Sequence, residues 1–427
     1  MIYDNKYKFS KYNIEAVHGD EGRTYLFNSY SGKGRWIDGP DLDDIKDKRG
    51  IDLGDVPEDL ADDGFIVPET ADEYGSLMKE IHEITRRSDT LYFIIATTKA
   101  CNYRCYYCFE GSHISNENMD PGTMEAVSAF IIGKCKENPG LKSLVLQWFG
   151  GEPLLFTEPI RRITQSLEEY AKANNIDLRG HITTNGRSLT PELVDEMADL
   201  YHIKTVQITL DGTASEYARI KGCSEDDFLR VVDNIRYAQD RLKVFIRLNL
   251  KDNLESLKEL IAYLYDMKLK VHVRISHIFD LSQNPEEYLA SYREYTEEHR
   301  ELADFIREEG YLKLFGDISK IPKRRLVCKA NACWHYAIDI YGNLFRCVEK
   351  ITDPAYSVGN IYEGITGQEL DRLFLENPLY DRCRECAYLP MCLGKCTMER
   401  LIENKGVDCE TVKRYIKENI KRTIAGK

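Results

Sequence analysis

Between residues 91 and 280, short apolar runs alternate with longer stretches in which apolar residues recur every three or four positions. Short apolar or alternating runs are typical of strands, and the longer spacing is typical of amphipathic helices. The strands predicted in this way are 91–97, 143–149, 178–183, 205–210, 244–250 and 271–276. The helices predicted between them are 123–136, 159–174, 191–200, 226–240 and 254–267. Six β–α units predict an α/β fold with a parallel sheet and right-handed crossovers.

The segment before residue 91 carries a weaker pattern. Strand-like runs occur at 25–32 and 64–68, with short acidic pieces around them at 41–48 and 55–63. Residues 71–87 follow, with Leu77, Ile81 and Ile84 at helical spacing. This order predicts a small α+β module that precedes the parallel sheet.

The segment after the sheet differs in kind. Residues 288–309 predict one long charged helix, whereas 328–409 show little apolar periodicity and hold eight of the 13 cysteines. Such a segment is expected to fold around metal rather than around an apolar core. We therefore divide the chain by content into residues 1–90, 91–310 and 311–427.

A cysteine triplet directly follows the first predicted strand of the sheet. Cys101, Cys105 and Cys108 form Cys-x3-Cys-x2-Cys. Three thiolates at this spacing can bind three irons of a [4Fe–4S] cube and leave the fourth iron open. A structural zinc site requires four ligands, and an electron-transfer cluster usually has four cysteines. A chance cluster or a zinc loop is the alternative interpretation.

The triplet resembles the loop of the radical S-adenosylmethionine (SAM) superfamily, in which an aromatic residue precedes the third cysteine, here Tyr107. Gly150, Gly151 and Glu152 come directly after the second strand and resemble the motif that contacts the amino group of SAM in that family. The resemblance implies a partial (β/α)6 barrel of the TIM type.

Later strand ends resemble further SAM-binding motifs of the family. Thr184 and Asn185 belong to a Thr-Asn-Gly sequence at the end of the third strand. Thr209 and Lys221 stand where relatives have a serine and an arginine that reach SAM. On the fifth strand, Arg247 and Asn249 alternate with apolar residues. Each of the two could be a functional residue or simply part of a polar lining of the barrel mouth.

Eight cysteines near the C-terminus equal two four-cysteine shells, which would suit zinc as well as iron–sulfur clusters. Their order resembles the SPASM domain of radical SAM maturases, which binds two auxiliary [4Fe–4S] clusters. The resemblance implies a first cluster on Cys328, Cys333, Cys347 and Cys396. It implies a second cluster on Cys383, Cys386, Cys392 and Cys409. Cys135 and Cys223 stand alone, and we assign them no role.

Composition narrows the class of protein. The net charge of −13 over 427 residues argues against a nucleic-acid partner. No apolar run approaches the length of a membrane helix, and the first residues lack a signal peptide. Cysteines in a chain without an export signal favour metal chemistry over disulfides. We expect a cytoplasmic protein without a membrane partner.

The resemblance implies an enzyme that uses SAM and three [4Fe–4S] clusters to generate a 5′-deoxyadenosyl radical. The first hypothesis is a maturase that forms a thioether or carbon–carbon cross-link in a ribosomally synthesised peptide. The N-terminal module then resembles a winged-helix element that recognises the leader of the precursor peptide. A flavodoxin- or ferredoxin-type protein would supply electrons. No residue is assigned as the catalytic base.

Two alternatives remain open at this point. One is an anaerobic sulfatase-type maturase that produces formylglycine. In that group an aspartate follows the third cysteine of the C-terminal domain, whereas Val348 follows Cys347 here. The other is a non-catalytic zinc-binding interaction protein, which accounts for the C-terminal cysteines but not for the triplet followed by Gly150 and Gly151.

Overall fold

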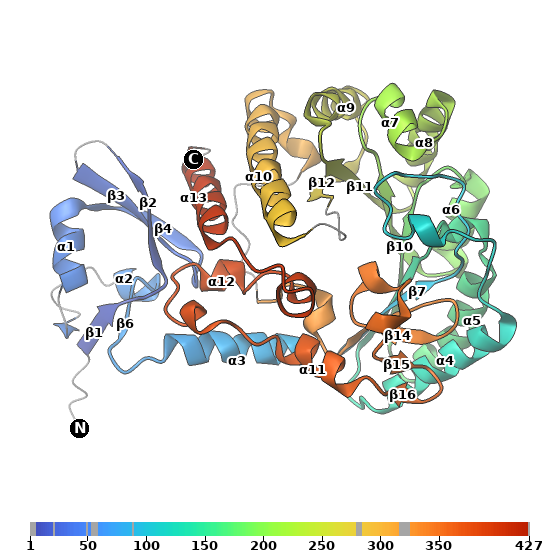
Figure 1. The fold of residues 1–427 in the computed structure, drawn as a ribbon, viewed down its shortest axis with the longest axis horizontal. Helices are drawn as coiled ribbons and strands as arrows, with labels where there is room; N and C mark the ends of the chain where they lie inside the picture. The colour runs from blue at the N-terminus through green and yellow to red at the C-terminus, as the bar shows by residue number, and fades with distance from the viewer. Residues whose placement is uncertain are drawn as a thin grey trace. The chain divides into compact units, whose positions relative to one another are not determined.

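A computed structural model describes residues 6–19, 22–47, 50–52, 59–87, 89–278, 284–315 and 325–425. The chain packs as two compact units (Figure 1). The first unit comprises residues 1–86, 317–331 and 377–427, and the second comprises 87–316 and 332–376. The first unit thus joins segments from both ends of the chain. The division into 1–90, 91–310 and 311–427 reflects motif content and stays a prediction.

The second unit is built on a large sheet whose central strands match the sequence prediction. Six neighbouring strands are parallel and follow one another in chain order across the sheet. They are β7 (Thr90–Ala96), β8 (Ser143–Phe149), β9 (Asp177–Thr184), β10 (Ile203–Thr209), β11 (Lys243–Leu250) and β12 (Val271–His277). The predicted α/β fold with a parallel sheet is confirmed.

Helices connect these strands and cover one face of the sheet (Figure 1). The predicted helices correspond to α4 (Pro121–Lys136), α5 (Glu158–Ala173), α6 (Pro191–Leu200), α8 (Glu225–Ala238), α9 (Leu254–Asp266) and α10 (Pro285–Glu308). Side chains alternate between the two faces of a strand. On β10, Val206 and Ile208 are therefore fully buried, while Thr205, Gln207 and Thr209 are on the opposite, polar face.

The helix between β10 and α8 was not predicted. Helix α7 (Ala214–Lys221) precedes α8 and ends at Gly222, which adopts a left-handed conformation with φ of 63°. Tyr217 and Ile220 are almost fully buried. The helix is short, and its packing rather than a long apolar period stabilises it.

The C-terminal segment corrects the expectation of a fold held by metal alone. Strand β13 (His335–Ile338) pairs parallel to β7 and so extends the large sheet. Strand β14 (Asn343–Phe345) pairs antiparallel to it, and β15 (Gly359–Asn360) and β16 (Gly364–Ile365) continue the sheet. Every residue of β13 is buried. Residues 335–345 are therefore held by the sheet and apolar core of the second unit.

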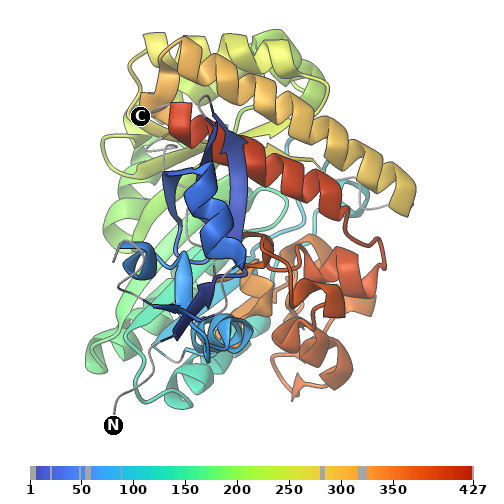
Figure 2. The same ribbon diagram turned by 90° about the vertical axis from the view of Figure 1, so that its left-hand side faces the viewer.

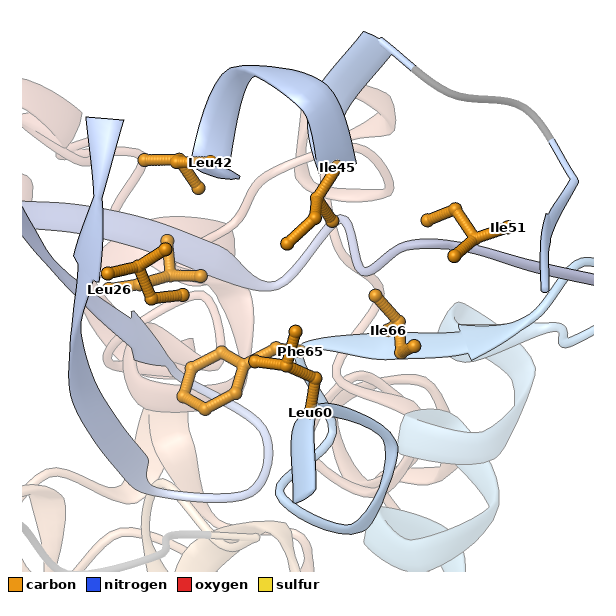
Figure 3. Close-up of a cluster of buried hydrophobic side chains, with 8 residues drawn as sticks. Leu26, Leu42, Ile45, Ile51, Leu60, Phe65 and Ile66 are labelled. Carbon is orange, nitrogen blue, oxygen red and sulfur yellow. The ribbon is translucent and has the colours of Figure 1, made fainter. Parts of the chain in front are cut away.

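The first unit contains two three-stranded sheets. One consists of β1 (Lys6–Phe9), β5 (Ile51–Asp52) and β6 (Ile66–Pro68), and the other consists of β2 (Asn13–His18), β3 (Arg23–Asn28) and β4 (Lys33–Asp38). The helices of this part are α1 (Gly39–Asp47), α2 (Asp59–Asp62) and α3 (Glu73–Thr85). Its core is the cluster in Figure 3, where Leu26, Leu42, Ile45, Ile51, Leu60, Phe65 and Ile66 converge.

The same unit includes the end of the chain, with α12 (Leu389–Cys392) and α13 (Cys409–Ala425). Tyr12 and Leu77 pack with Leu389 and Leu393 in one buried cluster. Helix α13 contacts β2 and lies beside the N-terminal sheet in Figure 2. The N-terminal module is therefore part of a larger core rather than an appendage. No helix in the described ranges is long and apolar enough to cross a membrane.

Candidate functional site

The predicted motifs of the second unit meet at one edge of its sheet. The cysteine loop follows β7, the glycine turn follows β8, and Thr184 and Thr209 end β9 and β10. Because these strands are parallel, their carboxyl ends lie along the same edge. Ligands of open α/β sheets bind at that edge, which makes it the candidate site.

The cysteine loop is anchored by the end of helix α7. The backbone N–H of Arg104 donates to the carbonyl of Lys221 at 2.9 Å, and that of Tyr106 donates to the carbonyl of Ile220 at 3.3 Å. Gly222 caps the helix at this point, and a side chain there would touch the Cβ of Arg104. The unpredicted helix therefore fixes the conformation of the predicted loop.

The donor set of the loop suits a cationic metal group. All three thiols are free and half-buried. Burial raises the pKa of Cys101 and of Cys108 to about 11, and it also raises the pKa of Cys105. A cation is therefore needed to hold them as thiolates. The Nδ2 atom of Asn102 is buried without a hydrogen-bond partner among the described residues, which leaves one donor for a bound group.

The glycine turn packs tightly against the strand that leads into the cysteine loop. Gly150 has φ of 114°, and its N-terminal neighbour ends β8. A Cβ atom on Gly150 would lie 2.5 Å from the carbonyl oxygen of Thr98, and one on Gly151 would lie 2.4 Å from that of Ala100. Only glycine fits this approach. Contact of the turn with SAM stays a prediction.

Glu152 connects the ends of two strands. Its side chain is fully buried and accepts hydrogen bonds from Thr184 Oγ1 at 2.6 Å and from the Asn185 N–H at 2.7 Å. It also accepts a bond from the N–H of Leu154 at 3.0 Å. Asn185 in turn donates through Nδ2 to Asn102 in the cysteine loop at 2.8 Å. Glu152, Thr184 and Asn185 thus hold three strand ends together.

Lys221 is part of a buried ion pair that sequence reasoning missed. Its Nζ lies 2.7 Å from Asp211 Oδ2 and 2.8 Å from Tyr107 Oη. The Tyr107 hydroxyl donates to the same carboxylate oxygen at 2.6 Å. Desolvation alone would lower the pKa of Lys221, but the charge of Asp211 outweighs it and the pKa is raised. Two of the three residues, Lys221 and Tyr107, were predicted to bind SAM; both contact Asp211 here, and their contact with SAM stays a prediction.

Asp211 is also held from the neighbouring strand. The N–H of Asn249 donates to its Oδ1 at 3.3 Å, and Asn253 Nδ2 donates to its carbonyl at 2.9 Å. Arg247 donates to Asn249 Oδ1 at 2.8 Å. The Thr-Leu-Asp-Gly sequence at 209–212 was the available signal for Asp211. Thr209 itself stands half-buried at the end of β10, and its contact with SAM stays a prediction.

The first unit contains a second cysteine site. Cys383, Cys386, Cys392 and Cys409, which were predicted to share one cluster, line a single pocket. Arg400 lines it too, and it is 2% exposed. Its Nε has no hydrogen-bond partner in the described part of the chain. Four thiols beside a buried cation with a spare donor suit an anionic iron–sulfur cluster.

The other four predicted ligands are divided between the two units. Cys328 and Cys396 belong to the first, and Cys333 and Cys347 belong to the second. Their common shell stays a prediction. Across the described residues, no three His, Cys, Asp or Glu side chains form a site for a single metal ion. A four-iron cluster needs its thiolates further apart than a single ion does.

A family model matches the part of the chain that holds these motifs. Residues 95–264 match the family model described as the radical SAM superfamily. The matched range includes the cysteine loop, the glycine turn and the buried Lys221–Asp211 pair. Residues 95–264 therefore correspond to a radical SAM domain, as the motifs in this range predicted.

Two relatives of known sequence match this chain over different lengths. The radical SAM cyclopropyl synthase TigE of Paramaledivibacter caminithermalis is 26% identical over 172 residues, which cover 36% of this chain and 35% of TigE. This chain thus spans about a third of that relative's length. The serine-type anaerobic sulfatase-maturating enzyme of Bacteroides thetaiotaomicron is 22% identical over 354 residues, which cover 73% of this chain and 83% of the relative.

Solved structures show the same fold. The structure of anSMEcpe with bound AdoMet and Kp18Cys peptide has a TM-score of 0.61 at 16% identity, and covers 79% of this chain and 98% of that one. SuiB of Streptococcus suis bound to S-adenosylmethionine has a TM-score of 0.53 at 15% identity. The match covers 95% of this chain and 96% of SuiB. SuiB was also solved with its precursor peptide SuiA. The fold class expected from the motifs is confirmed.

Proposed function

We propose that this chain is a radical SAM enzyme that modifies a ribosomally synthesised peptide by forming a thioether or carbon–carbon cross-link. The observation that carries the proposal is the convergence of the cysteine loop, the glycine turn and the Glu152-bound strand ends at one sheet edge. The radical SAM match includes all of them. A zinc-binding interaction protein would need none of this arrangement.

Cys101, Cys105 and Cys108 hold the SAM-binding cluster in this proposal. Bound there, the cluster and SAM supply hydrogen-atom abstraction from the substrate. The protein's own part is to position SAM and the substrate and to exclude water from the site. Glu152, fully buried between three donors, keeps the SAM-binding turns in register. Main-chain atoms of the Gly150–Gly151 turn then remain to receive the amino group of SAM.

The cysteines near the C-terminus hold two auxiliary clusters in the same proposal. The pocket lined by Cys383, Cys386, Cys392 and Cys409 takes one of them. Clusters bound to these cysteines would supply an electron acceptor for the oxidised substrate or a ligand site for a substrate thiolate. A flavodoxin- or ferredoxin-type donor supplies the starting electron. We place the protein in the cytoplasm, without a nucleic-acid or membrane partner.

The N-terminal module supports a peptide substrate. The SuiB structures cover 95% of this chain and so include the module, whereas those of anSMEcpe cover 79%. Strand β4 is an outer strand of its sheet, and Trp36 on it is 39% exposed. A leader peptide added beside β4 would extend the sheet by main-chain hydrogen bonds. The winged-helix resemblance stays part of this proposal.

The experiment uses the full chain, because deleting the module would expose the cluster formed by Tyr12, Leu77, Leu389 and Leu393. A candidate precursor peptide, sought among short reading frames beside this gene, is incubated anaerobically with the reconstituted enzyme, with and without its leader. We expect a cross-link, seen as a mass loss, only when the leader is present. Trp36→Ala should weaken leader binding, and Tyr362→Ala, which removes another exposed aromatic ring, should not.

A second candidate function is the formylglycine-producing sulfatase-type maturase. The observation in its favour is the relative of that name, of which 83% is covered. Against it, Val348 follows Cys347, where that group has its aspartate base. Incubation with a serine- or cysteine-containing sulfatase peptide separates the two functions. If formylglycine forms in that peptide and the candidate precursor peptide is not modified, the sulfatase-type function replaces our first proposal.

A further inference from the structure

On β11 and β12, the face of the sheet that points away from the helices carries several basic side chains. Lys243, Phe245, Arg247 and Asn249 alternate along β11 on this face, and His272 and Arg274 stand beside them on β12. The register places Phe245 opposite His272 and Arg247 opposite Arg274. Their neighbours on the helix side, such as Val244 and Ile246, are fully buried. Strand β12 is the outermost strand of the sheet, so this face is accessible from the edge.

Two cations on this face lie over the ring of Phe245, and a third, Arg247, follows two residues further along β11. The Nζ of Lys243 lies 5.1 Å from the ring centre of Phe245, and the guanidinium carbon of Arg274 lies 4.4 Å from it. His272 stacks on the same ring at 5.2 Å. We call Lys243, Arg247 and Arg274, with Phe245 between them, the cationic face. The pKa of His272 is lowered, first by desolvation and then by the charges of Lys243 and Arg274.

No carboxylate of a described residue pairs with the cationic face. Within the described residues, Lys243, Arg247 and Arg274 form no ion pair, and Arg247 bonds only to the amide oxygen of Asn249. Other cations nearby are paired: Lys258 lies 2.6 Å from Glu301, and Lys270 lies 3.0 Å from Asp240. In a chain with a net charge of −13, three unpaired cations side by side favour the binding of an anionic partner, which would offset their mutual repulsion.

The cationic face begins beside the candidate site. Arg247 is in register with Thr209 at the carboxyl end of β10. Asn249, two residues further along β11, donates its N–H to Asp211, which binds Tyr107 of the cysteine loop. A peptide whose modified residue lies at the carboxyl edge of the sheet could therefore extend along β11 and reach the cationic face.

We propose that the cationic face binds carboxylate side chains of the substrate, so that the peptide is acidic next to its modified residue. Guanidinium groups bind carboxylates through two parallel hydrogen bonds, and two arginines offer this contact. Phe245 provides apolar surface for the backbone and methylene groups between the carboxylates. The inference rests on the proposed function, because it takes the peptide as the occupant.

The test measures peptide binding to the reconstituted full chain with SAM. The probes are a short fluorescein-labelled peptide in which glutamate alternates with alanine, and its counterpart with glutamine in place of glutamate. We expect the glutamate peptide to bind about tenfold more tightly, as two exposed ion pairs of ordinary strength allow. Added salt should reduce this ratio.

Variants decide whether the cationic face is responsible. The double variant Arg247→Gln with Arg274→Gln should lose the preference for glutamate. The control Lys258→Gln with Lys270→Gln removes the same charge from lysines that are already paired, and it should keep the preference. A preference retained by the arginine variant overturns the proposal. Equal competition by free glutamate overturns it too, because the face would then bind small carboxylates.

The two proposals can fail separately. Formation of 5′-deoxyadenosine under reducing conditions is measured on the same preparation. If it forms and the glutamate preference is absent, the acidic-peptide inference is wrong and the proposed function stands. If none forms while the preference is present and depends on the arginines, the binding face is confirmed and the proposed function is wrong.

Discussion

Replacing Lys221 by methionine tests the buried ion pair beneath the cysteine loop. The side chains of Lys221 and Asp211 are 3% and 1% exposed, and their charged atoms lie 2.7 Å apart. Methionine fills a similar volume but leaves the Asp211 carboxylate buried without its cation. Removing one partner of such a pair costs about 3–5 kcal/mol of folding free energy. We expect a loss of that size.

A second variant separates the lost charge from lost packing. Asp211→Asn added to Lys221→Met removes both charges and leaves Tyr107 a neutral partner. Replacing a whole buried pair by uncharged groups is often close to neutral, so the double variant should recover about half or more of the loss. Lys258→Met is the matched control, because its exposed partners make that pair worth about 1 kcal/mol or less.

The assay combines urea unfolding of the full chain with hydrogen exchange. The N–H of Arg104 bonds to the carbonyl of Lys221, so its exchange reports on the cysteine loop directly. Faster exchange at Arg104 should accompany the loss of stability in Lys221→Met. A single variant as stable as the parent, or a double variant as unstable as the single, would refute the reasoning. Unchanged stability with weakened SAM binding would instead support the predicted contact of Lys221 with SAM.

Further expected outcomes concern the clusters and the effect of pH. Cys101→Ala, Cys105→Ala or Cys108→Ala should each abolish 5′-deoxyadenosine formation, with iron falling from about twelve to about eight per chain, four for each cluster. Cys383→Ala should lower both the iron content and the urea midpoint, because binding of the cluster by its cysteines stabilises the fold. A variant with the parental iron content and the parental urea midpoint would exclude Cys383 as a ligand. Burial lowers the pKa of His277 from 6.5 to about 4. The unfolded chain therefore binds the proton first, and acidification from pH 7 to 5 should cost the parent on the order of 2 kcal/mol more than His277→Gln; equal losses would contradict this.

Sequence patterns predicted the parts of the fold that repeat. All six strands of the parallel sheet were found within one or two residues, because each is a short apolar or alternating run flanked by stretches with helical spacing. Strand β13 was missed because it has only four residues, which pair with β7 from more than 200 positions away. Helix α7 was missed because its eight residues contain few apolar positions. Short elements are stabilised by contacts that no local pattern records.

The candidate site was predictable as a set of motifs but not as a network. Spacing identified the cysteine loop and the glycine turn, because ligand chemistry fixes both. The partner of Lys221 could not be predicted in the same way, since an ion pair depends on where two elements meet in space. Tyr107 likewise contacts Asp211 from a position 104 residues away. The charge on β11 and β12 became visible only when the register of the two strands was known.

The cluster of Tyr12, Leu77, Leu389 and Leu393 has a consequence for synthesis on the ribosome. The first two residues are made early, and the other two follow about 300 positions later. At ordinary translation rates this interval lasts roughly 15–60 s. The N-terminal module must wait that long with apolar surface uncovered, and a ribosome that stalls before residue 389 would release a chain that cannot complete its core. Chaperone demand during translation is therefore expected to concentrate at the beginning of this protein.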